Sequence, residues 1–293
     1  MQKKIFGRTA LCLSALFILG DAVIILPLED GAYYTLYSFL SASALGLVLY
    51  FAVSFIYGKL ASSQKDNSFK NAIEKLIFLA VAVFSMFISA DTFSVFTKFA
   101  SEVILKNTPF YIINIVFFGV VLYFAFKRQE CVLKFSLVFF IFVLVLILFF
   151  FLASITDYTP ENLALKTPID GTIFYKSAKS FIKTPIFSSL ILPLYYRFAL
   201  KERHISAHFG VIIGYLLLGL AIISSLLLFG SELSAELSYP HFSAVSTITV
   251  GRLYTRLDGF LYFVYFITSI IKINVCLFIT YSCLKRLGWL KSR

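Results

Sequence analysis

About eight apolar segments, each long enough to cross a lipid bilayer, follow one another along this 293-residue chain, with short charged loops between them. Hydrophobic residues make up 60% of the sequence and charged residues only 14%. A water-soluble domain of this size needs far more polar surface to cover its core. The composition therefore excludes a soluble domain and predicts a protein whose solvent is the bilayer.

The apolar stretches are continuous rather than alternating, as residues 139–146 illustrate. Lipid offers the backbone no hydrogen bonds, so a spanning chain forms helices or a closed barrel, and a barrel needs alternation. We therefore predict an all-α membrane protein with one transmembrane domain over residues 1–293, and a short extra helix within the loop 230–256. With about 20 residues needed per span, the expected helices are 9–26, 34–57, 72–105, 110–126, 135–155, 174–200 (broken), 211–229 and 257–284.

Basic residues are distributed unevenly among the loops. With the N-terminus inside, the inner segments hold 17 of the 26 Lys and Arg residues but four of the 15 acidic residues. Positively charged loops stay in the cytoplasm, so both termini are predicted to be cytoplasmic. Because this charge is spread over five segments, the bilayer's anionic headgroups are a better partner for it than nucleic acid, which we do not expect as a partner. The inner basic residues are Lys3, Lys4, Arg8, Lys59, Lys65, Lys70, Lys75, Lys127, Arg128, Lys134, Arg197, Lys201, Arg203, Lys285, Arg286, Lys291 and Arg293.

Two of the expected spans carry helix-weakening residues. The first contains Gly20 and closes at Pro27, and the sixth contains Pro185 and Pro193. Such breaks survive in a bilayer where the freed backbone groups face protein or a water-filled cavity. Paired interruptions five helices apart point to the binding site of an inverted-repeat transporter. The alternative is that proline is simply common in membrane helices.

Three ionisable residues lie within the expected helices: Asp21, Asp91 and Lys272. A charge at the bilayer centre costs about 2.5–3.5 kcal/mol on insertion scales, so such residues are rarely idle. Lys272 is too far from either interface to reach water, and we expect it to face the bundle interior. Our hypothesis is that it is a fixed cation at the break in the first span, bound to Asp21 or to backbone carbonyls. A purely structural lysine, paired with Asp91 or a carbonyl, is the alternative.

Residues for catalysis or metal binding are sparse. The three histidines, His204, His208 and His241, fall in loops or at helix ends, and the four cysteines lack metal spacing. The sequence contains neither a glycine-rich phosphate loop nor a nucleophile elbow. We therefore predict that the protein is not an enzyme and expect no cofactor or metal.

Four stretches together resemble the spore germination permeases, the GerAB-type B subunits of nutrient germinant receptors in the amino acid–polyamine–organocation superfamily. The opening helix reads FILGDAVIILP at residues 17–27, and the segment after the third helix reads SEVILKNTP at 101–109. The outer loop contains Tyr239-Pro240. The last helix begins with RLDGF at 256–260 and continues to IKI at 271–273, which is similar to the intramembrane lysine of the family.

This resemblance implies a leucine-transporter-type fold with a site for an amino acid or a similar nutrient between helices 1, 3, 6 and 8. The ligand carboxylate would meet backbone amides of the first helix, and the broken sixth helix would supply further contacts. The resemblance also implies a larger A-type membrane subunit and a C-type lipoprotein as partners, in the spore inner membrane or the cell membrane. The implied ligand-binding residues are Gly20, Asp21, Ala22, Phe187, Ser188 and Ser189, with Lys272, Asp21 and Asp91 as the charge site.

Two departures from the family pattern leave other functions open. Members usually have ten helices, whereas this chain stops after the eighth, and a glutamate of the sixth helix is replaced by the run 186–193, IFSSLILP. A nutrient sensor is the leading interpretation. The alternatives are a proton-coupled amino acid transporter that uses Asp21, Asp91 or Lys272, and a structural subunit or truncated copy that binds no ligand.

Overall fold

A computed structural model describes residues 2–24, 35–62, 68–163, 171–200, 205–247 and 258–289, and every regular element in these ranges is helical. The all-α prediction is therefore confirmed. The long elements are α1 (Gln2–Leu19), α2 (Thr35–Ser62), α3 (Ser68–Phe99), α4 (Phe110–Ala125), α5 (Gln129–Ala153), α9 (Ile205–Glu236) and α11 (Asp258–Arg286). The shorter ones are α6 (Gly171–Phe181), α7 (Phe187–Ser189), α8 (Leu192–Leu200) and α10 (Pro240–Ser246), with π-helical turns at Ala100–Ile104 and Ile182–Ile186 and 3-10 turns at Ile155–Asp157 and Pro160–Leu163.

Among the described residues, five helical segments are long and apolar enough to cross a membrane. They lie in α2, α3, α5, α9 and α11, and two shorter apolar helices, Gly7–Leu19 and Phe110–Ala125, accompany them. Continuous apolar helices of this length need lipid around them. The chain is therefore a multi-pass integral membrane protein.

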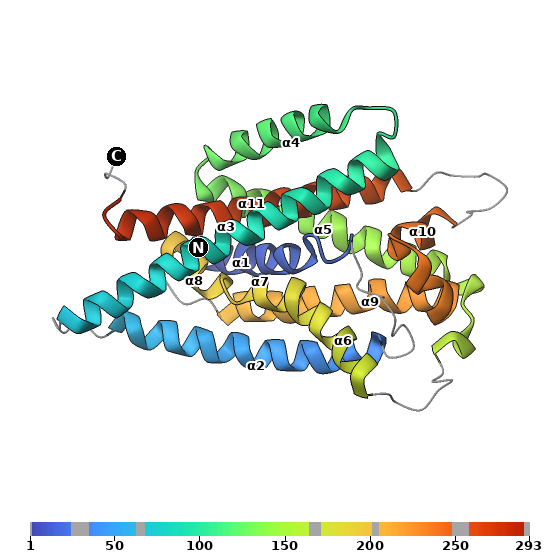
Figure 1. Ribbon diagram of the computed structural model, residues 1–293, viewed down its shortest axis with the longest axis horizontal. Coiled ribbons are helices and arrows are strands. Elements are labelled where there is room, and N and C mark those ends of the chain that lie inside the picture. Colours follow the sequence, from blue (N-terminus) through green and yellow to red (C-terminus); the bar gives the residue numbers. More distant parts are fainter. Residues whose placement is uncertain are drawn as a thin grey trace.

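The long helices run back and forth along the molecule, with α1 inside the bundle and α2 and α4 at opposite margins (Figure 1). Helix α1 packs chiefly on α9 and also contacts α5 and α11, while α11 packs on α3. Two glycines of α9 allow the tight approach to α1. A Cβ on Gly214 would lie 2.7 Å from the Cβ of Ile18, and one on Gly210 would collide with the carbonyl oxygen of Leu11.

Burial divides the spanning helices into two groups. In α9 and α11, 67% and 72% of the apolar window is buried, whereas α2, α3 and α5 bury only 22%, 28% and 28%. Large side chains such as Val48 on α2 are exposed in the second group, and so is Ile115 on the shorter helix α4. On a membrane protein such apolar surface faces lipid tails and needs no protein cover.

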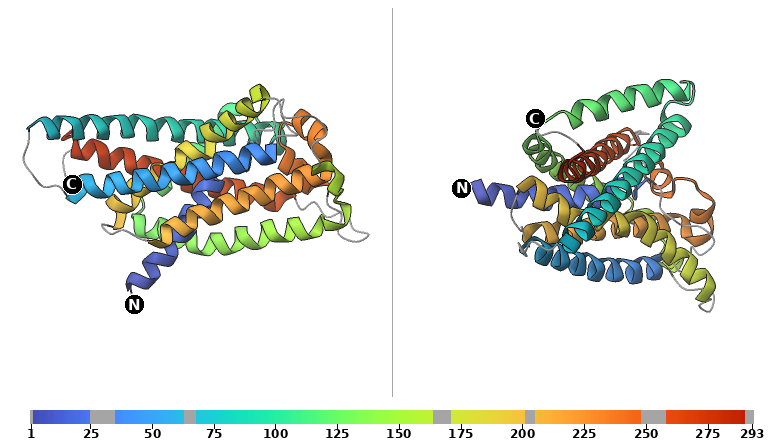
Figure 2. Two further views of the ribbon diagram at one scale, coloured as in Figure 1. Left: turned by 90° about the horizontal axis from the view of Figure 1, so that it is seen from below. Right: turned by 60° about the vertical axis from the view of Figure 1, so that its left-hand side comes forward.

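The start of α1, the end of α2, the start of α3 and the end of α11 all lie at one end of the molecule, while α10 and the connection from α3 to α4 lie at the other (Figures 1 and 2). The helix ends that flank the predicted basic segments thus share one end. This arrangement agrees with the inner and outer sides expected from the charge pattern, and the cytoplasmic orientation itself stays a prediction.

The helix boundaries differ from those expected in informative ways. The first helix ends at Leu19, whereas the sequence predicted residue 26, and its last expected residues, 25–26, lie outside the described ranges. The predicted span 72–105 is α3 together with a π-helical turn, and the predicted broken span 174–200 is the series from α6 to α8. Helix α10 is the short helix expected in the outer loop.

Candidate functional site

The first helix breaks in the middle of the bundle. Beyond Leu19 the chain forms turns over residues 20–24, where the N–H of Gly20 donates to the carbonyl of Leu16 (3.0 Å) and that of Val23 to the carbonyl of Leu19 (3.1 Å). Among the described residues, the N–H groups of Asp21 and Ala22 donate to no backbone carbonyl. The break thus leaves two adjacent amides available in a buried place.

A buried ion pair fixes this break to the last helix. The Nζ of Lys272, in the middle of α11, binds the Oδ1 of Asp21, and the two side chains are 1% and 2% exposed. The hydroxyl of Thr92 on α3 donates to the other carboxylate oxygen of Asp21 at 3.1 Å. Removing one partner of such a pair leaves an uncompensated buried charge, which typically costs about 3–5 kcal/mol.

Gly20 allows the lysine stem to lie directly against the backbone of the break. A Cβ at Gly20 would lie 2.5 Å from the Cδ of Lys272. The hydroxyl of Thr268, one turn before Lys272 on α11, also donates to the Gly20 carbonyl at 3.2 Å. The glycine is therefore required for close approach as much as for weakening the helix.

The sixth span breaks where the prolines predicted it. A π-helical turn that contains Pro185 leads into the single turn α7, and a further turn at 190–191 precedes α8. Ser188 and Ser189 are buried, and their hydroxyls donate to the carbonyls of Pro185 (3.0 Å) and Ile186 (2.7 Å). Helix α7, at the break in the sixth span, contacts α1, the helix that the first break ends.

The structure brings together some predicted site residues and separates others. Asp21 and Lys272 pair, whereas Asp91 is exposed on α3 and its neighbour Thr92 takes the place beside the carboxylate. The side chain of Phe187 is 42% exposed, and its ring meets that of Phe84 edge-on with centroids 6.5 Å apart. The functional role of each of these residues stays a prediction.

Three residues that the sequence analysis did not single out also belong to this region. Thr92 and Thr268 bind the break in the first helix, and Tyr215 on α9 donates to the hydroxyl of Ser189 at 3.2 Å. Thr268 lies four residues before Lys272 on α11, and residues i and i+4 share a helix face. The sequence alone could therefore have indicated that Thr268 faces the break. Nothing in the pattern of α9 distinguishes Tyr215 from a core tyrosine.

Within the described part of the chain, several buried polar atoms have no hydrogen-bond partner. On α11 they include the hydroxyls of Tyr265 and Ser269. At 100° per residue both side chains lie on the same face of α11 as Lys272. Buried polar atoms are normally paired with protein, water or ligand, so this face offers hydrogen bonds that no described residue uses.

The end of the bundle opposite the basic helix ends is covered by α10, which packs on α9 and α11 (Figure 1). The hydroxyl of Tyr239, just before α10, donates to Glu102 at 2.6 Å and so connects this cover to the end of α3. His241 on α10 is buried, and neither ring nitrogen has a partner among the described residues. Burial lowers the pKa of His241 to about 4, so the ring is neutral at physiological pH.

A comparison with known protein families identifies a match. The family described as spore germination protein matches residues 35–291, which is most of the chain. No curated protein and no solved structure matches it. Lys272 and the broken sixth span lie within the matched region, and Gly20 and Asp21 precede it.

Proposed function

Because the chain belongs to the spore germination protein family, we propose that it is a permease-like receptor subunit that binds an amino acid or a similar small nutrient and signals germination. The resemblance noted from the residues alone is thereby confirmed at the level of the family. The observation that carries the finer proposal is the buried pair of Lys272 and Asp21 at the break in the first helix.

The break suits the carboxylate of a small ligand. The N–H groups of Asp21 and Ala22, which bond no backbone carbonyl in the described part of the chain, are donors at a buried place. Backbone amides at a helix break favour anions, because they hydrogen-bond directly and carry the positive end of the peptide dipole. Lys272 adds a positive charge beside them, although its amine is already bound to Asp21.

The rest of the ligand would lie between the two breaks and α11. Ser188 and Ser189 provide hydroxyls at the break in the sixth span, and Ser269 and Tyr265 provide partnerless hydroxyls on α11. These groups both donate and accept hydrogen bonds. They therefore suit an ammonium group or a short polar side chain better than a large apolar ligand.

The buried ion pair of Lys272 and Asp21 fits a nutrient receptor better than a transporter. With both side chains buried, Lys272 holds a positive charge at the break without any ion being taken up. A ligand reaches the amides only when the helices around the pair open, so binding favours the open state over the closed one. We infer that A-type and C-type subunits, in the spore inner membrane, receive this change.

Ser269 allows a sharp test with the purified full chain in lipid nanodiscs. Each common amino acid is added in turn and thermal stability is measured. One of them should stabilise the protein, and Ser269→Ala should need roughly tenfold more of it, the equivalent of one hydrogen bond. Without ligand the variant should be as stable as the parent, because this hydroxyl has no partner to lose.

Ser43→Ala is the matched control and should respond like the parent, because this half-buried serine of α2 bonds only the carbonyl of Leu40 in its own helix. If no amino acid or related nutrient shifts the thermal stability, the ligand-binding proposal is wrong. If one does and Ser269→Ala responds unchanged, the ligand lies elsewhere than on this face of α11.

A proton-coupled transporter is the second candidate, and the same ion pair is the observation that supports it, because ionisable residues inside membrane proteins commonly form proton pathways. Uptake of the stabilising amino acid into sealed vesicles separates the two functions. Accumulation that depends on a pH gradient supports transport, and binding without accumulation supports the receptor.

A further inference from the structure

A positively charged helix face lies in the part of the sixth span that precedes its break. Helix α6 packs on α2 and lies beside its beginning (Figure 1). Its side chains at Tyr175, Lys176 and Lys179 are exposed, and at 100° per residue they share one face. Ser177 and Phe181 are buried on the opposite side. Helix α6 is therefore amphipathic, and two lysines lie on its free face.

A hydrogen bond between α2 and α6 fixes the depth of these lysines. The hydroxyls of Ser38 and Ser177 are 2.6 Å apart. Ser38 lies three residues, or about 4.5 Å, inside the beginning of the apolar stretch Thr35–Tyr57. The boundary between headgroups and acyl chains falls where the apolar part of a spanning helix stops. Lys176 and Lys179 flank Ser177 closely, so their long side chains reach the headgroup level.

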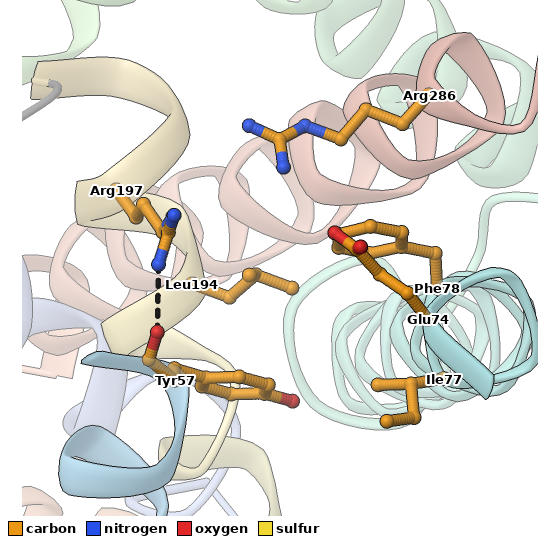
Figure 3. Close-up of a pocket in the computed structure, with 7 residues that line it drawn as sticks. All are labelled: Tyr57, Glu74, Ile77, Phe78, Leu194, Arg197 and Arg286. Carbon is orange, nitrogen blue, oxygen red and sulfur yellow. Dashed lines mark hydrogen bonds between the residues drawn. The ribbon is translucent and has the colours of Figure 1, made fainter. Parts of the chain in front are cut away.

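The two lysines of α6 differ from cations that the protein itself engages. At the basic end of the bundle, Arg197 donates to the carbonyl of Tyr57 at 2.6 Å (Figure 3). Arg286 lies over two phenylalanine rings, 4.6 and 5.3 Å from their centroids. Lys176 and Lys179, in contrast, form no hydrogen bond, ion pair or ring contact with any described residue. Their ammonium groups are therefore available to a ligand.

The surroundings of these lysines lack an anion and supply apolar surface. Neither α2 nor α6 contains an aspartate or a glutamate. Beside the lysines Tyr175 is 67% exposed, and Tyr37 and Leu40 at the beginning of α2 are 45% and 55% exposed. Tyrosine is enriched at the level where acyl chains meet headgroups. A molecule with an anionic head and apolar tails would contact both kinds of surface.

We propose that the free face of α6 binds the headgroup of an anionic phospholipid such as phosphatidylglycerol, with Lys176 and Lys179 on its phosphate. The acyl chains would lie along the exposed apolar side chains at the beginning of α2. The lipid would hold α6 against α2 at the membrane surface. This proposal is independent of the nutrient site, because it uses none of the residues at the two helix breaks.

Fluorescence quenching of one tryptophan tests which lipid lies beside α6. In the full chain, Trp289→Phe removes the natural tryptophan and Tyr175→Trp places a reporter on the face of the two lysines. Nanodiscs of phosphatidylcholine contain a fixed fraction of either phosphatidylcholine or phosphatidylglycerol with brominated acyl chains, which quench on contact. Phosphatidylglycerol should be preferred by roughly fivefold or more, because one lysine near an anionic surface contributes roughly that factor.

The reporter chain with Lys176→Gln and Lys179→Gln should lose this preference and melt like the parent, because both lysines are exposed. The matched control carries Lys98→Gln and Lys106→Gln. These substitutions make the same change of charge at exposed positions on α3 and after its π-helical turn, and the preference should remain.

Equal quenching by the two lipids would overturn the proposal and leave this face to water or to an acidic protein. Equal losses in the two double variants would show that only net charge matters and would overturn the assignment to α6. Sodium phosphate that abolishes the preference more effectively than sodium chloride of the same ionic strength would show a free-anion site and overturn the lipid assignment.

Discussion

The buried centre of this protein and its lipid-facing margin are both built from apolar helices but pack in different ways. Around α1, α9 and α11, glycines bring backbones together and polar groups are paired across helices. On α4, a Cβ at Gly119 would meet no described atom of a neighbouring element within 4 Å, and Ile115 and Tyr123 on the same face are exposed. Tight polar contacts therefore mark the region where function is expected, and hydrophobicity does not.

Removing a buried charge should give the largest difference in stability between the two regions. Lys272→Met leaves Asp21 buried without its cation, so the free energy of unfolding should fall by about 3–5 kcal/mol. The double variant Asp21→Asn with Lys272→Met should regain most of that loss. Lys98→Met, at an exposed position on α3, should change little. Thermal unfolding in nanodiscs measures all three, and a single variant as stable as the parent would show that the pair is not held in the bundle.

Measuring stability against pH tests whether α10, which covers one end of the bundle, holds its histidine in the buried region. The pKa of His241 is lowered in the folded protein from 6.5 to about 4. Between these values the unfolded chain binds more protons, so stability is present above pH 6.5 and is lost as the pH falls toward 4, by about 3 kcal/mol in all. His241→Phe should flatten this dependence. An unchanged acid slope in the variant would place His241 in contact with water.

Replacing a glycine by alanine distinguishes a glycine that is closely packed from one that faces open space. Gly20→Ala forces a Cβ against the Cδ of Lys272 and should cost about 1–3 kcal/mol by overpacking. Gly119→Ala meets nothing and should be neutral or slightly stabilising, because alanine is the better helix former. Thermal stability of the two variants gives the comparison, and equal effects would remove the distinction between the regions at these positions.

Loss of one hydroxyl should have a smaller effect. Thr92→Val removes the hydrogen bond to Asp21 and should cost about 1–2 kcal/mol, because interhelical hydrogen bonds in membranes are modest. Thr97→Val on the same helix is the control, since its hydroxyl bonds only carbonyls of α3 itself. The same unfolding assay applies, and equal costs at the two positions would argue against a role for Thr92 at the break.

The margin should tolerate changes that the centre does not. Ile115→Leu and Phe118→Leu on the exposed face of α4 should shift the free energy of unfolding by no more than about 0.5 kcal/mol. A larger loss in the unfolding assay would show that this face of α4 contacts protein rather than lipid.

The role of residues that are unusual in a membrane helix was predictable from the sequence. Which side of an apolar helix faces the bundle interior was not. Glycine, proline and an isolated lysine each have few structural solutions in a bilayer, which is why the two breaks and the inward-facing Lys272 could be expected. Helix α3 is apolar on every side, so no pattern could show that Thr92 rather than Asp91 turns inward. The exposure of Phe187 was also not predictable, because the π-helical turn before it shifts the register of the residues that follow.

The central claim is that the buried pair at the break serves the nutrient response and not only the fold. The most direct test measures amino acid-induced germination of spores that carry the double variant Asp21→Asn with Lys272→Met, after checking that the protein is present at the parental level. The account predicts a folded subunit with little or no response. A full response at the parental amino acid concentration would contradict it and leave the pair a structural element.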